Sequence, residues 1–210
     1  MTYDAVIFDI DGTLWNACSS SAKGWNLSLE KLGMCQRVTP RQIESVAGNT
    51  DERCLDILLP GERVNHPGLL EVLNEHERQA IFADGGEFYQ GVVTGIIRLA
   101  NQCRIFLVSN CQEWYLDLFL KLSKLRPMFS GVDCYGMSGL TKEKMLGRMK
   151  RDYSLKNPVY VADTASDEKA AALAGITFIY VTWGFGKPEG SATSVHSFTE
   201  LLDCLEGRTN

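Results

Sequence analysis

The sequence has no long hydrophobic run, and a helical membrane span needs about 20 consecutive apolar residues. Its first residues, MTYDAVIFDID, carry an acid where a secretory signal has basic residues, and no small-residue cleavage site follows. We therefore expect a cytoplasmic protein that does not act at a membrane.

Basic residues are in the minority. The 210 residues include 21 Lys and Arg against 26 Asp and Glu, which gives a net charge of −5. A negative chain is poorly suited to nucleic acid or to an anionic membrane surface, so we expect neither as a partner. The hydrophobic share of 45% and the charged share of 22% are typical of a globular protein with a buried core.

Metal-binding cysteine pairs and histidine clusters are also absent. The seven cysteines are scattered, and none forms a CxxC pair, which excludes a zinc ribbon and a disulfide framework. The three histidines, His66, His76 and His196, have no metal-ligand spacing, and we assign them no role.

From residue 92 onward, short apolar runs alternate with amphipathic stretches. The runs predict strands over residues 104–109, 158–162 and 177–182, besides a first strand at 4–9 and a shorter one at 134–135. The amphipathic stretches predict helices over residues 92–101, 112–125, 142–151 and 166–175. This order predicts an α/β, Rossmann-like parallel sheet with helices on both faces.

Residues 16–90 have a different character, because no strand is evident there. Amphipathic helices are predicted over residues 21–33, 39–48 and 66–84, the second with Thr39 as N-cap and Pro40 in the first turn. We therefore predict a core of residues 1–15 and 91–210, and a small all-helical unit of residues 16–90 inserted after the first strand.

The stretch VIFDIDGTLW, residues 6–15, places Asp9 and Asp11 directly after the first strand. In open α/β sheets, ligands bind beyond the carboxyl ends of the strands. A single acid before Gly12 and Thr13 is ordinary turn chemistry. Two carboxylates this close repel each other unless a cation or a proton lies between them, which favours a functional reading.

Polar side chains also follow the other predicted strands. The second ends in Ser109 and Asn110, the third is followed by Asp163 and Asp167, and Lys142 begins the helix between them. Taken singly, these residues are also explained by a loop pair, a surface lysine and a helix N-cap. Their common order after strand ends favours one site, in which the lysine faces an anion.

The four motifs DIDGT, VSN, TKEK and ADTASD resemble those of the haloacid dehalogenase-like superfamily of phosphohydrolases. The resemblance covers nearly the whole chain. Within the superfamily, the sequence is similar to capped phosphatases of the phosphoglycolate phosphatase and β-phosphoglucomutase type. It implies that residues 16–90 form a helical cap over a catalytic core.

The resemblance implies roles for the acids. Asp9 is expected to be the nucleophile that forms an aspartyl-phosphate, and Asp11 the general acid and base. Mg²⁺ is expected to be held by the carboxylates of Asp9 and Asp163 and by the backbone carbonyl of Asp11.

Further residues are expected to hold the phosphoryl group and to support the site. The resemblance gives phosphoryl binding to Ser109, Asn110 and Lys142, and leaves Lys144 as the competing choice for the lysine. Asp167 is expected to position Lys142 or the metal-bound waters, and Thr13 to support the turn after Asp11.

The expected reaction is hydrolysis of a small phosphorylated metabolite by a monomeric enzyme. Asp11 favours phosphoryl transfer over carbon–halogen hydrolysis, because only an alkoxide leaving group needs a proton. A phosphomutase and a phosphate-binding module without turnover are the alternatives. Trp15 and Asn16 stand where related phosphatases often have an acid and a serine, so the substrate stays open, as do the roles of these two residues and of Cys111.

Overall fold

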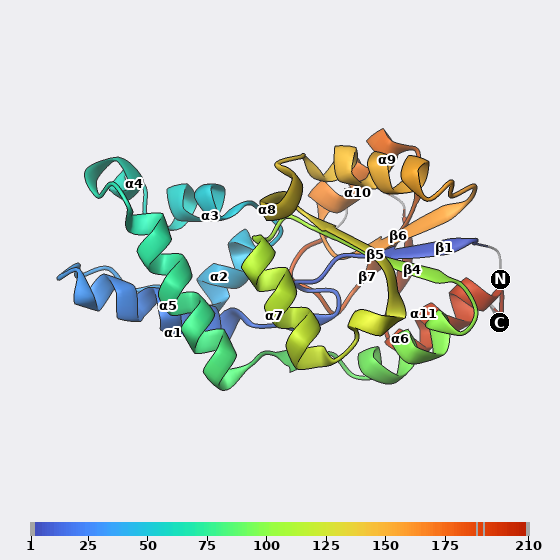
Figure 1. The fold of residues 1–210 in the computed structure, drawn as a ribbon, viewed down its shortest axis with the longest axis horizontal. Helices are drawn as coiled ribbons and strands as arrows, with labels where there is room; N and C mark the ends of the chain where they lie inside the picture. The colour runs from blue at the N-terminus through green and yellow to red at the C-terminus, as the bar shows by residue number, and fades with distance from the viewer. Residues whose placement is uncertain (1–2, 188, 191, 209–210) are drawn as a thin grey trace.

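The computed structural model describes residues 3–187, 189–190 and 192–208. Within these residues, six strands form one parallel sheet, to the right in Figure 1. In sheet order the strands are β5 (Phe129–Cys134), β4 (Arg104–Ser109), β1 (Ala5–Phe8), β6 (Pro158–Ala162), β7 (Thr177–Val181) and β8 (Thr193–Val195). The predicted strand bounds of β4 and β6 are confirmed.

Strand β1 lies in the middle of the sheet because both of its faces are apolar. All four of its residues are buried, and Ala5 pairs with Arg104 on β4 and with Pro158 on β6. Alternate side chains point to opposite faces of a strand. The side chains of Val6 and Phe8 therefore enter one core, and Ala5 and Ile7 enter the other.

Helices cover both faces of the sheet (Figure 1), which confirms the predicted fold class. On the face of Val6 and Phe8 lie α6 (Val92–Ala100), α7 (Glu113–Ser123) and α11 (Phe198–Glu206). On the face of Ala5 and Ile7 lie α9 (Lys142–Asp152) and α10 (Ala165–Ala174).

A group of helices stands apart from the sheet, at the left of Figure 1. We call residues 17–86 the helical insertion. It contains α1 (Cys18–Lys31), α2 (Pro40–Val46), α3 (Asp51–Leu58), α4 (Glu62–Asn65) and α5 (Leu69–Asp84). The chain enters it through β2 (Trp15–Asn16) and leaves it through β3 (Glu87–Phe88), and these two strands pair antiparallel.

The helical insertion has a hydrophobic core of its own. Trp25 and Leu29 of α1 pack with Leu73 of α5 and Leu55 of α3, and all four are buried. Burying such side chains contributes roughly 1.5–3 kcal/mol each. Helix α2 begins as predicted, because Thr39 forms a capping box with the residue at the third helical position.

Several elements differ from the prediction. Cys134 ends β5 rather than beginning a strand, and Tyr135 already belongs to α8 (Tyr135–Ser138). Strand β5 lies at the sheet edge and carries polar residues, so its sequence lacks the apolar run of the inner strands. The sequence analysis missed the pair β2–β3, because each of these strands has only two residues. It also assigned no element at α3, α4, α11, β8 and the 3₁₀ turn Arg126–Met128.

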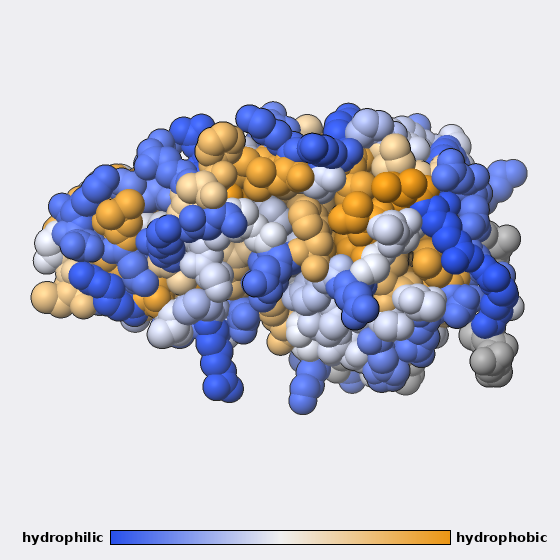
Figure 2. Space-filling view, turned by 90° about the horizontal axis from the view of Figure 1, so that it is seen from below, coloured by the Kyte–Doolittle hydropathy of each residue, from blue (hydrophilic) through white to orange (hydrophobic). Residues whose placement is uncertain are grey.

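The surface is mixed in polarity. Figure 2 shows hydrophobic patches among hydrophilic side chains on the lower face. Across residues 3–187, 189–190 and 192–208, no helix is long and apolar enough to cross a membrane.

Candidate active site

Three neighbouring strands bring polar side chains to one edge of the sheet. Asp9 follows β1, Ser109 ends β4, and Asp163 follows β6, so Asp9 lies between the other two. The Asp9 amide still donates to the Val161 carbonyl at 3.1 Å, which fixes its backbone as a continuation of the sheet. All three side chains are buried. The strand ends therefore assemble the predicted residues into one site.

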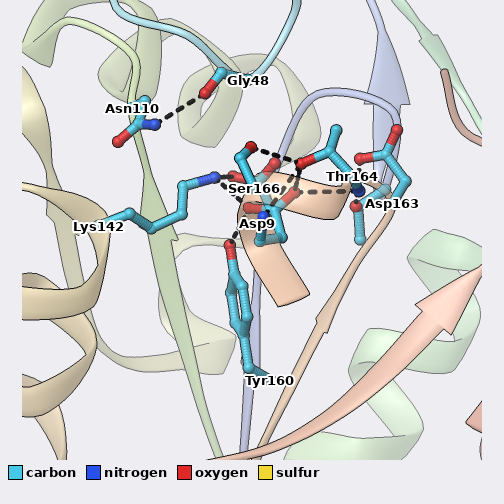
Figure 3. A network of polar contacts seen from close by, with 10 residues as sticks. Asp9, Gly48, Asn110, Lys142, Tyr160, Asp163, Thr164 and Ser166 are labelled. Carbon is cyan, nitrogen blue, oxygen red and sulfur yellow. Dashed lines mark hydrogen bonds and ion pairs between the residues drawn. The ribbon is translucent and has the colours of Figure 1, made fainter. Parts of the chain in front are cut away.

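Lys142 is the cation of this site (Figure 3). Its Nζ lies 3.2 Å from Asp9 Oδ1 and 2.5 Å from Asp167 Oδ1, and only 5% of its side chain is exposed. The hydroxyl of Tyr160 also donates to Asp167 Oδ1, at 3.0 Å. Lys144, the competing choice, is exposed to solvent. The structure thus brings Lys142, and not Lys144, to the Asp9 carboxylate.

Asp167 is held from both sides. Its Oδ2 accepts the hydroxyl and the amide of Thr164, which is the N-cap of α10, in a capping box. The N-cap is therefore Thr164, and not Asp167 or Ser166, and Asp167 is the third residue of the helix. Because Thr164 and Tyr160 fix Asp167, the position of Lys142 is fixed as well.

Asp163 sits in a pocket that glycines leave open. A Cβ on Gly12 would lie 2.2 Å from Asp163 Oδ2, and a Cβ on Gly184 would lie 2.3 Å from Asp163 Cβ. The Phe185 amide donates to Asp163 Oδ2 at 2.7 Å, and Thr13 Oγ1 donates to Oδ1 at 3.4 Å. The stretch TWGFG after β7 is thus part of the site, through backbone that wraps Asp163.

Asp11 lies across the turn from Asp9, and Tyr115 of α7 donates its hydroxyl to Asp11 Oδ1. Gly12, with φ of +74°, makes the turn between the two acids possible. Sequence reasoning missed Tyr115 and Tyr160, because neither of them follows a strand in the way the four motifs do. It also assigned no role to Thr164, although this residue lies within the fourth motif, ADTASD.

The positive charge of Lys142 does not balance the buried carboxyl groups of the site, and three of these groups have raised pKa values. Burial raises the pKa of Asp9 to about 6, although the Lys142 charge acts in the opposite direction. Burial also raises the pKa of Asp163 to about 7, helped by the charges of Asp167 and Asp9. Burial raises the pKa of Asp11 to about 7, despite the hydrogen bond from Tyr115. An additional cation would favour the ionised form of all three acids.

Three acids are close enough to share a metal ion. Oxygens of Asp9, Asp163 and Asp167 all lie within 4.8 Å of one another. Asp167 already accepts bonds from Lys142, Tyr160 and Thr164, so Asp9 and Asp163 are the better ligands. Buried carboxylate oxygens are the donors that hard divalent cations prefer, and the residues present therefore fit such an ion.

The second motif connects the sheet to the helical insertion. Ser109 is buried at the end of β4. Asn110 donates its side-chain amide to the Gly48 carbonyl at 2.7 Å, as Figure 3 shows. Asn110 therefore contacts the insertion with the side chain, and its backbone remains beside the strand ends.

Trp15 and Asn16 have structural positions. Trp15 is fully buried against Phe88, and its ring also contacts the rings of Tyr115 and Phe119. Asn16 Oδ1 accepts the Cys18 amide at 2.9 Å at the start of α1. Both residues therefore shape the passage from the sheet into the helical insertion.

A cavity of about 80 Å³ lies between the strand ends and the helical insertion. Asp11, Ser109 and Asn110 line it from the sheet, while Trp25, Asp51 and Glu77 line it from the insertion. Cys111 is buried in its wall. A water molecule needs about 10–15 Å³ measured in this way, so the cavity has room for a group of a few non-hydrogen atoms.

Comparison with known proteins gives one family. The model of the haloacid dehalogenase-like hydrolase family matches residues 6–181. The chain is 27% identical over 226 residues to a phosphoglycolate phosphatase of Chromobacterium violaceum, with 96% of each chain covered.

Solved structures share the fold. A predicted phosphoglycolate phosphatase from Haemophilus somnus 129PT has a TM-score of 0.81 at 18% identity, covering 100% of this chain and 99% of that one. A predicted phosphatase from Clostridium acetobutylicum has a TM-score of 0.80 at 21% identity, covering 99% of this chain and 100% of that one.

Proposed function

The chain belongs to the haloacid dehalogenase-like hydrolase family, and on this premise we propose that it is a Mg²⁺-dependent phosphatase of small phosphorylated metabolites. The observation that carries the proposal is the convergence of three side chains: Asp9 and Asp163 follow the adjoining strands β1 and β6, and Lys142 reaches Asp9 from the start of α9. The similarity to phosphatases agrees with this chemistry.

In the first step of the proposed reaction, a carboxylate oxygen of Asp9 attacks phosphorus and the bond from phosphorus to the ester oxygen breaks. Asp11 gives its proton to the departing alkoxide, which suits a carboxyl whose pKa burial raises to about 7. The product on the protein is an aspartyl-phosphate on Asp9.

In the second step, Asp11 takes a proton from a water molecule, whose oxygen attacks phosphorus. The bond to the Asp9 oxygen breaks, and inorganic phosphate leaves. Tyr115 keeps Asp11 in place for both proton transfers, because its hydroxyl bonds to Asp11 Oδ1.

The phosphoryl oxygens require positive charge and hydrogen-bond donors. Lys142, the Ser109 hydroxyl and the Asn110 backbone amide lie at the strand ends for this task. Asp9, Asp163 and the Asp11 carbonyl would hold Mg²⁺, which when bound offsets the negative charge of the phosphoryl group and the acids. Asp167 fixes Lys142.

We propose that residues 16–90 act as a cap over a catalytic core of residues 1–15 and 91–210. The bond from Asn110 to Gly48 and the cavity at the junction support this division. A closed cap would keep bulk water from the intermediate. We also propose that the enzyme is monomeric and cytoplasmic; the seven free thiols support the second of these proposals.

The test is phosphate release from methyl phosphate, whose small leaving group fits the cavity, with Mg²⁺ or with EDTA. Asp9→Asn should abolish release, while Asp152→Asn, at an exposed carboxylate at the end of α9, should keep it. Release that persists in Asp9→Asn, or that does not depend on metal, would overturn the proposed mechanism.

A further inference from the structure

The cavity beside Asp11 is where the leaving group of a bound ester would lie. Its wall includes Asp11, Ser109 and Asn110, which the proposed reaction places around the phosphoryl group. The rest of the substrate therefore extends toward the helical insertion, into a space of about 80 Å³. Only a small leaving group fits this space.

The far wall of the cavity is acidic. Asp51 at the start of α3 and Glu77 of α5 line it, and its lining, drawn from the described residues, contains no lysine, arginine or histidine. Removal from water raises the pKa of Asp51 to about 6 and that of Glu77 to about 7. Both carboxyls would therefore gain from a cation in the cavity.

One oxygen of this wall lacks a partner. Asp51 Oδ2 is buried and accepts no hydrogen bond among the described residues, although hydrogen bonds from Asn74 and Gln112 to the Asp51 carboxyl act to lower its pKa. Buried polar atoms are almost always paired, so an unpaired acceptor in a cavity wall points to a ligand that donates. Glu77 Oε2, by contrast, accepts the Trp25 Nε1 hydrogen at 2.8 Å, which fixes the orientation of its carboxyl.

Aromatic rings complete the wall. Trp25, Trp114 and Tyr115 all line the cavity. The face of an aromatic ring attracts a cation. Carboxylates and aromatic rings together form surroundings that suit an ammonium group better than a hydroxyl or a carboxylate.

We propose that the physiological substrate is a small phosphate monoester whose leaving group carries an ammonium, bound by Asp51 and Glu77 among these rings. This inference rests on the proposed phosphatase function and adds its substrate class. This substrate class differs from that of the phosphoglycolate phosphatase of Chromobacterium violaceum, since the glycolate of phosphoglycolate carries a carboxylate. In this cavity such a carboxylate would face two acids without a cation.

The test compares three esters of similar size: 2-aminoethyl phosphate, 2-hydroxyethyl phosphate and phosphoglycolate. A hydrogen bond to a charged group contributes about 1.5–3 kcal/mol, or about ten- to a hundredfold in rate. We expect kcat/KM for the ammonium ester to exceed that for the hydroxyl ester by at least about tenfold, and phosphoglycolate to be the poorest substrate.

Neutral variants identify the residues responsible. Asp51→Asn and Glu77→Gln should each lower kcat/KM for 2-aminoethyl phosphate and raise it for phosphoglycolate. A gain on one ester cannot come from misfolding. Glu75→Gln, on the exposed side of the same helix, is the matched control and should keep the original order.

The outcomes separate the two proposals. Metal-dependent release from methyl phosphate with equal rates on the three esters, or with phosphoglycolate preferred, overturns the substrate class and leaves the phosphatase function standing. No metal-dependent release from any of the four esters overturns both. The expected order, lost in both neutral variants and kept in Glu75→Gln, supports both.

Discussion

The hydroxyl of Tyr115 donates a hydrogen bond to Asp11 Oδ1, although 104 residues separate the two in the chain. Tyr115 belongs to α7, on the face of the sheet that carries Val6 and Phe8. The proposed general acid is therefore oriented by a helix that contributes none of the four sequence motifs.

Tyr115→Phe removes this bond while keeping the ring in place. We expect kcat to fall about tenfold with little change in KM, because a hydrogen bond to a charged group contributes about 1.5–3 kcal/mol. The bond from Tyr115 lowers the pKa of Asp11, so its loss should raise that pKa further. Asp11 then keeps its proton to higher pH, and the alkaline limb of the pH profile of kcat/KM should shift to higher pH.

Tyr153→Phe is the control for this prediction, because Tyr153 packs on Phe106 away from the strand ends that hold the acids. Steady-state kinetics across pH distinguish the two variants. An unchanged profile in Tyr115→Phe would remove Tyr115 as a positioning residue.

Gly184→Ala places a methyl group against Asp163. The added Cβ would lie 2.4 Å from Asp163 Oδ2, so the carboxylate must shift. A misplacement of about 1 Å can cost a hundredfold in rate, and we expect a loss of that order with a higher Mg²⁺ concentration for half-maximal activity.

Gly147→Ala is the matched control, because a Cβ at this position of α9 meets no atom within 4 Å. This change should stabilise the protein by about 0.5–1 kcal/mol and leave turnover intact. Wild-type metal affinity in Gly184→Ala would show that Asp163 does not bind the metal.

Lys142→Met should be costly for stability and for activity. It leaves Asp9 and Asp167 buried without their cation, and breaking a buried pair costs about 3 kcal/mol or more. Lys144→Met removes an exposed lysine on the same helix and should change neither quantity strongly. Urea unfolding and phosphate release measure the two effects, and equal behaviour of the variants would reject Lys142 as the lysine of the site.

Stability should depend on pH in a way that metal reverses. The pKa values of Asp9, Asp11 and Asp163 are raised to about 6, 7 and 7, so the folded protein binds these protons more tightly than the unfolded chain. Their contribution is present at low pH and is lost as pH rises through 6 to 7. In EDTA, we therefore expect the Tm to fall between pH 5 and pH 8.

Mg²⁺ should restore this stability, and its effect on Tm should be larger at pH 8, where the acids are ionised. Asp163→Asn removes one of the titrating acids and should weaken both the fall in EDTA and the response to Mg²⁺. A Tm in EDTA that rises over the same interval would contradict the proposed sign.

The inner strands were predictable because a strand that is buried on both faces needs consecutive apolar residues, and such a stretch is recognisable in the sequence. Strands β4 and β6 match their predicted bounds, since each contains at least four consecutive buried apolar residues. Strand β5 was misplaced because Ser130, Gly131 and Asp133 break its pattern at the sheet edge. Periodicity reports burial, so it is weakest where a strand is half exposed.

Some residues of the candidate site were also predictable from the sequence, and others were not. Asp9, Ser109 and Asp163 could be found from the sequence because strand order brings strand ends together. Tyr160 lies within β6 and looks like any core aromatic, yet its hydroxyl fixes Asp167. Asp51 and Glu77 lie on exposed-looking helices, and only the packing of the helical insertion on the sheet shows that they face a cavity.

The chain enters the helical insertion through β2 and leaves it through β3. The pairing of these two strands holds the two connections side by side, with Trp15 opposite Phe88 and Asn16 opposite Glu87. Everything between them is therefore a cassette with its two ends at one point of attachment. A different cassette could be grafted at these four residues without moving any strand of the main sheet. Under the proposed division into core and cap, reaction chemistry and substrate choice would be separately exchangeable parts, and the protein would serve as a scaffold for redesigning specificity.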